Sequence, residues 1–114
     1  MKQTKDSKRI FTDEKFANPG KDYRGLPFWA WNAKMEQGKM TKEIDTFKEM
    51  GFGGFVDHAR NGLQDRYMGE SFLNAVAHSV EEAKEKNLNV WLYDEDRWPS
   101  GCSGGYVNVN RCHR

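Results

Sequence analysis

Three short apolar runs, separated by two stretches with helical periodicity, constrain the fold of this 114-residue chain most strongly. The runs cover residues 26–31, 53–56 and 90–93, and each is rich in aromatic and aliphatic residues, as is typical of a strand buried on both faces. The resulting order is β-α-β-α-β. At this spacing the order predicts βα units, and therefore a parallel sheet with right-handed crossovers.

The first helical stretch follows a polar loop at residues 33–39. Thr41 is a suitable N-cap, Ile44, Phe47 and Met50 recur at helical spacing, and Gly51 can supply the left-handed residue that ends a helix.

The second helical stretch is predicted to begin at a Ser71 cap and to end near Asn87, with Glu82 and Lys86 paired on its polar side. Its apolar residues form one stripe, which consists of Leu73, Val76, Ala77, Val80 and Ala83.

Polar residues follow all three predicted strands. Asn32 follows the first strand, His58 and Arg60 follow the second, and the acidic triplet Asp94, Glu95 and Asp96 follows the third. Carboxyl ends of parallel strands lie side by side, and α/β folds place their binding sites there. We therefore expect these residues to share one site.

The acidic triplet is the main candidate for chemistry, because adjacent like charges need cations, hydrogen bonds or a substrate to stabilise them. Two residues along a strand advance about 6.6 Å, which resembles the separation of the carboxylates in an inverting glycosidase. Neighbours on one strand cannot flank a scissile bond, so we expect Asp94, Glu95 and Asp96 to bind substrate hydroxyls or a cation. A solvated acidic loop is the alternative.

The remaining candidates combine aromatic rings with hydrogen-bond donors. Trp29, Trp31 and Trp98 could stack on sugar rings, with Asn32 beside them, or could simply fill the core. His58 and Arg60 could donate hydrogen bonds to sugar hydroxyls. The alternative is an ion pair between Asp57 and Arg60 that closes the rim of the sheet.

Composition excludes several classes of function. With 18 basic and 17 acidic residues the net charge is +1, which gives no electrostatic case for nucleic acid or an anionic membrane. Neither a membrane-spanning run nor a secretion signal is present in the sequence, so we expect a cytoplasmic protein whose Cys102 and Cys112 are free thiols. No pair of ligands has zinc spacing, and no metal site is assigned. Calcium is the metal that clustered carboxylates would suit.

A family resemblance covers roughly residues 23–105. The segments YRGLPFWAWN, EMGFGGFVDHARNGL and NVWLYDEDRWPSG, in this order, resemble the start of the catalytic barrel of α-L-rhamnosidase-like glycoside hydrolases, family 106 and its relatives. The resemblance implies a (β/α)8 barrel, inverting hydrolysis of terminal sugars, and room for calcium in the site. On the family pattern the principal catalytic acids lie on later strands.

We therefore expect an incomplete (β/α)8 TIM-barrel fragment at residues 22–105, between a flexible polar lead-in (1–21) and an irregular tail (106–114). The resemblance implies that the parent function is hydrolysis of a carbohydrate substrate, and an open sheet predicts self-association of the fragment. Two alternatives remain: a metal-dependent hydrolase of a non-sugar substrate, and a gene remnant with no independent activity.

Overall fold

The computed structural model describes residues 11–96, 100–107 and 109, and it forms an α/β structure around one small sheet. The sheet contains β1 (Phe28–Trp31), β2 (Gly54–Ala59) and β3 (Asn89–Asp96) in the order β1-β2-β3, with both neighbouring pairs parallel. The predicted β-α-β-α-β order with parallel strands is confirmed.

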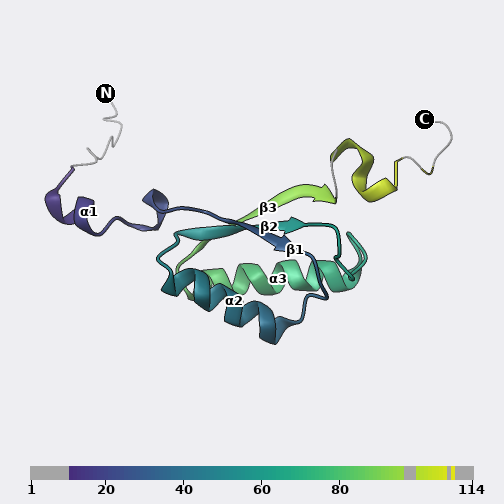
Figure 1. Cartoon of the computed structure of the whole chain (residues 1–114), viewed down its shortest axis with the longest axis horizontal. Coiled ribbons are helices and arrows are strands. Elements are labelled where there is room, and N and C mark those ends of the chain that lie inside the picture. Colours follow the sequence, from purple (N-terminus) through teal and green to yellow (C-terminus); the bar gives the residue numbers. More distant parts are fainter. Residues whose placement is uncertain (1–10, 97–99, 108, 110–114) are drawn as a thin grey trace, which may run out of the picture.

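Two long helices, α2 (Gln37–Glu49) and α3 (Glu70–Glu85), lie on the same face of the sheet (Figure 1). Three short helices complete the described chain, and these are α1 (Asp13–Ala17), η1 (Lys21–Tyr23) and η2 (Ser100–Gly105). The α1 helix lies inside the segment expected to be a polar lead-in, where the Thr12 hydroxyl accepts a hydrogen bond from the Lys15 amide.

Both long helices begin earlier than the sequence pattern predicts. The α2 helix starts after Glu36, so Thr41 lies inside it, and its hydroxyl contacts the His78 ring of α3 instead of capping a helix end. The α3 helix starts after Gly69, and the Ser71 hydroxyl donates to Asp65 in the preceding loop. In both cases the hydroxyl makes a tertiary contact that replaces the predicted cap.

The helix ends agree with the prediction. Gly51 and Asn87 both adopt positive φ, 82° and 54°, directly after α2 and α3. Such left-handed residues let the chain turn back toward the next strand. The predicted Glu82–Lys86 pair on α3 is also present, and Lys86 additionally reaches Asp45 of α2.

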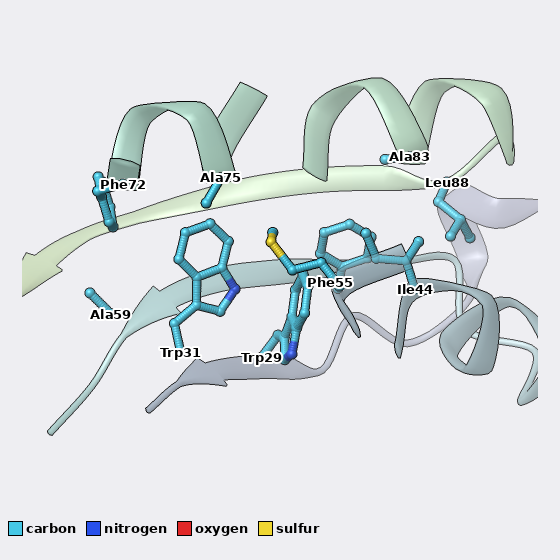
Figure 2. Packing of buried hydrophobic residues seen from close by; sticks show 10 residues of the cluster. Trp29, Trp31, Ile44, Phe55, Ala59, Phe72, Ala75, Ala83 and Leu88 are labelled. Carbon is cyan, nitrogen blue, oxygen red and sulfur yellow. The ribbon is translucent and has the colours of Figure 1, made fainter. Parts of the chain in front are cut away.

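Aromatic rings fill the layer between the sheet and the helices (Figure 2). Trp31, Phe55 and Phe72 are almost fully buried, and edge-to-face contacts join Trp31 to Phe72 and Trp29 to Phe55. Such ring pairs add specific geometry to the large apolar area that they remove from water. This layer is the core of the molecule.

The other face of the sheet has no covering layer within the described residues. Phe28 of β1 and Trp91 of β3 are 62% and 63% exposed there, with Val56 of β2 between them in register. We refer to this surface as the open face.

The side of α3 that faces the core differs from the predicted apolar stripe. The residues that it buries are Phe72, Ala75, Ser79 and Ala83. Leu73 and Val80 of the predicted stripe are about half exposed, because they lie on the flank of α3 beyond the core. An apolar flank therefore remains uncovered.

The sheet depends on a close approach at Gly54, where an added Cβ would lie 1.9 Å from the Asn89 carbonyl oxygen of β3. Gly54→Ala should therefore lower the free energy of unfolding by about 1–3 kcal/mol, as overpacking does. Gly38→Ala is the matched control, because it adds the same methyl group to α2 with nothing within 4 Å. Chemical denaturation should show that control unchanged or about 1 kcal/mol more stable. Equal effects at the two positions would contradict the argument.

Candidate functional site

The carboxyl ends of the three strands lie at one edge of the sheet. Trp31, Ala59 and Asp96 are in register across β1, β2 and β3, and the Arg60 amide donates a 3.0 Å hydrogen bond to the Trp31 carbonyl. Asn32 and Arg60 follow directly and are both exposed. The structure thus brings Asn32, Arg60 and the acidic triplet to the same edge.

The tryptophans of β1 do not face this edge. Trp29 and Trp31 are 6% and 1% exposed and point into the core, where the Trp29 Nε1 donates to a Glu43 carboxylate oxygen. Of the two interpretations of these residues, core packing is therefore the one that the geometry favours. Trp98 lies outside the described residues.

His58 lies on the open face between two aromatic rings. Its ring centroid is 5.5 Å from that of Phe28 and 4.3 Å from that of Tyr93. Burial against these rings lowers the pKa of His58, and the Arg60 charge lowers it further, while Glu95 opposes both. The imidazole is therefore neutral at pH 7, with one nitrogen to donate and one to accept a hydrogen bond.

The acidic triplet does not follow simple strand alternation. Between the pairs Asp57–Leu92 and Ala59–Asp96, β3 advances four residues while β2 advances two. Asp94 is exposed, Glu95 is half-buried and Asp96 is 7% exposed. The three carboxylates therefore occupy different environments, although the sequence places them side by side.

A hollow of about 280 Å³ adjoins the end of β3. Its lining comes from the β2–α3 loop, β3 and the segment after it, and consists of Leu63, Gln64, Asp65, Arg66, Tyr67, Asp96, Gly104 and Tyr106. We call it the β3-tip pocket. Asp96 alone among these residues belongs to the sequence-predicted site.

Hydrogen bonds hold the walls of the β3-tip pocket together. Arg66 Nε donates to the Tyr106 hydroxyl at 2.7 Å, and its guanidinium lies 5.4 Å from the centre of the Tyr106 ring. The Tyr67 hydroxyl donates to the Asp94 carbonyl oxygen at 3.0 Å. Burial and the neighbouring acids raise the pKa of Tyr67, so this phenol remains a donor.

Sequence reasoning missed Arg66, Tyr67 and Tyr106, because they occupy a loop and a segment without periodicity. The available signal was their chemistry, since arginine offers several N–H donors and tyrosine both donates and accepts through its hydroxyl. A larger hollow, of about 490 Å³, lies near the N-terminal ends of α2 and α3 and is lined by none of the predicted site residues.

The described part of the chain holds neither a cluster of metal-ligating side chains nor a membrane-spanning helix. No group of three or more potential metal-ligating side chains gathers there, so its geometry offers no support for calcium. No helix in that part has the length and apolar character needed to cross a bilayer. In comparisons of the chain with known proteins, no family model, curated protein or solved structure matches it.

Asp57, which precedes the predicted His58 and Arg60, is a buried acid on the helix side of β2. It is 1% exposed, and one carboxylate oxygen accepts from the Ser79 hydroxyl while the other has no partner. Burial raises the pKa of Asp57 to about 7, against the opposing effect of Ser79. Its carboxylate faces α3, so the ion pair with Arg60, the alternative interpretation of this pair, does not form.

Folding stability should therefore depend on the protonation of Asp57. The folded chain holds this proton up to about pH 7, whereas the unfolded chain releases it near 3.8. The free energy of unfolding should fall as the pH rises between these values, by up to about 4 kcal/mol. Asp57→Asn should remove that part of the slope and be more stable than the parent at pH 8 in denaturant titrations.

Asp13→Asn, in the exposed α1 helix, is the control for this experiment and should retain the slope. An Asp57→Asn variant with an unchanged pH dependence would show that Asp57 ionises normally in the folded chain.

Proposed function

We propose that this chain is the first part of a (β/α)8 barrel of the α-L-rhamnosidase-like glycoside hydrolase type, and that its role is to bind the sugar. The observation that carries the proposal is the shared edge of the parallel sheet, where Asn32, Arg60 and the acidic triplet gather and where Asp96 lines the β3-tip pocket. α/β barrels bind their substrates at this edge.

The chemistry of the β3-tip pocket supports a sugar ligand. Sugar hydroxyls donate and accept hydrogen bonds at once, and Arg66, Gln64 and Asp96 provide charged donors, an amide and a carboxylate. Two tyrosine rings add aromatic surface, which takes over the role that the sequence suggested for tryptophan. At about 280 Å³ the hollow is just below the usual range for drug-sized ligands, which suits a single sugar ring.

Binding rather than catalysis is favoured for the acidic triplet. An acid and a base must flank the scissile bond, separated by roughly 6.5–9.5 Å in an inverting enzyme. Asp94, Glu95 and Asp96 all belong to one strand, and Asp96 is buried beside Tyr67 and Gly104. The proposal therefore assigns the acid/base pair to strands beyond β3.

L-Rhamnose should bind weakly, with a dissociation constant of about 1 mM, as expected for one small ring with few contacts. Titration of the isotope-labelled chain, followed by amide NMR, should shift the signals of Arg66, Tyr67 and Tyr106. Arg66→Ala should abolish these shifts. Lys48→Ala, in a hollow that shares no residue with the proposed site, should not. Signal changes confined to other regions, or none at millimolar sugar, would contradict the proposal.

The isolated chain should not hydrolyse aryl α-L-rhamnosides, because the proposed acid/base pair lies outside it. The measurement is release of the aryl alcohol by the purified chain. Turnover that disappears in an Asp94→Asn variant would overturn the assignment, since it would show that this chain holds a catalytic acid of its own.

A further inference from the structure

The β2–α3 loop, residues 60–69, is held in place by hydrogen bonds to segments on both sides of it. On one side the Gln64 amide donates to the Ala33 carbonyl, in the loop after β1, at 3.3 Å. On the other side the Tyr67 hydroxyl donates to the Asp94 carbonyl of β3 at 3.0 Å. The loop therefore bridges the edge at which the three strands end.

Asp65 connects the same loop to two further segments through its carboxylate. Its Oδ2 accepts from the Met35 amide at 2.9 Å, and its Oδ1 accepts from the Ser71 hydroxyl, in the first turn of α3, at 2.5 Å. The hydrogen bonds from Ser71 and from Met35 lower the pKa of Asp65, so the side chain is ionised at pH 7. Hydrogen bonds to an ionised carboxylate are stronger than those between neutral groups. Asp65 thus fastens the loop to the segment before α2 and to the start of α3.

Met68 adopts a backbone conformation that a residue with a Cβ atom does not favour. Its φ is 59°, in the left-handed region, which costs free energy. The Met68 side chain is 54% exposed, so its burial offsets little of this cost. The Gly69 amide donates to the Arg66 carbonyl at 2.8 Å and closes the turn around Met68. Strain of this kind persists only where surrounding contacts impose the conformation.

The strained turn sets the direction of the two side chains before it. Arg66 and Tyr67 directly precede Met68, and both line the β3-tip pocket. The Tyr67 ring packs on Phe72 of α3, with the ring centroids 5.1 Å apart, while its hydroxyl reaches β3. Rotation of Met68 to a negative φ would redirect the chain between Tyr67 and α3 and would break this arrangement.

We propose that Asp65 is a positioning residue for the sugar site, which holds the Arg66–Gly69 turn in its strained conformation and so directs Arg66 and Tyr67 into the β3-tip pocket. This inference rests on the proposed sugar-binding function. Asp65 and Met68 act in opposite directions. When Asp65 loses its partners, Met68 relaxes to a negative φ and the pocket loses its walls.

Two other roles for Asp65 lead to different expectations. A direct contact with the sugar would compete for oxygens that already accept hydrogen bonds from Met35 and Ser71. A general contribution to stability would affect the whole fold, although Asp65 lies outside the buried aromatic core. A role through Met68 differs from both, because it predicts that a change at residue 68 compensates for the loss of Asp65.

The affinity of the full chain for L-rhamnose, measured by NMR titration, tests the proposal. Asp65→Asn keeps the shape of the side chain but leaves one oxygen acceptor, so the dissociation constant should rise about tenfold as Met68 relaxes. Met68→Gly alone should leave it unchanged, because glycine adopts positive φ without strain. Adding Met68→Gly to Asp65→Asn should restore it to within about threefold of the parent value, a non-additive effect.

Asp45→Asn is the matched control. Asp45 is another partly exposed carboxylate that joins two elements, since it pairs with Lys86 between α2 and α3. This variant should bind the sugar as the parent does. Ser71→Ala removes one of the two bonds to Asp65 and is the milder variant if Asp65→Asn does not fold. It should raise the dissociation constant about threefold.

Backbone NMR of Met68 without sugar separates this inference from the proposed function. Its chemical shifts and couplings should report a positive φ in the parent and a negative φ in Asp65→Asn. If φ changes in this way but the parent binds no sugar, the proposed function fails and the hold of Asp65 on the loop stands. A positive φ retained in Asp65→Asn would overturn the inference. Weak binding that Met68→Gly does not restore would also overturn it, and would indicate direct contact between Asp65 and the sugar.

Discussion

Burial of the aromatic layer between the sheet and the two helices is the constraint on which the rest of the structure depends. Trp31, Phe55 and Phe72 come from β1, β2 and α3, so their contact fixes three separate elements relative to one another. Burying side chains of this size contributes more than any single hydrogen bond at the site. The carboxyl ends of the strands meet at one edge because this layer holds the strands parallel beneath common helices.

The order of the elements followed from periodicity, and the individual contacts did not. Gly51 and Asn87 mark helix ends because left-handed backbone is a local property, which is visible in the sequence. Thr41 and Ser71 were assigned as caps on equally sound local grounds, yet their hydroxyls bond to His78 and Asp65. A capping preference of about 1 kcal/mol is easily replaced by a tertiary partner that the sequence does not reveal.

The candidate site shows the same division between local and tertiary information. The positions of the strand ends predicted that Asn32, Arg60 and Asp94 would lie at one edge of the sheet, because the carboxyl ends of parallel strands share an edge. The direction of each side chain could not be derived in this way. Trp29 and Trp31 have rings that could stack on a sugar, but both side chains lie on the buried helix side of β1. Tyr67 and Tyr106, in contrast, contact Asp94 and Arg66 from segments without periodicity.

The change of register between β2 and β3 has a consequence for recognition. Where β3 advances four residues against two in β2, peptide groups are released from the regular ladder at the rim of the sheet. One of them, the Asp94 carbonyl, already accepts from the Tyr67 hydroxyl. Main-chain groups of this kind are independent of side-chain identity, so part of the hydrogen-bonding capacity at the tip of β3 would persist even if all three acids were exchanged for neutral residues.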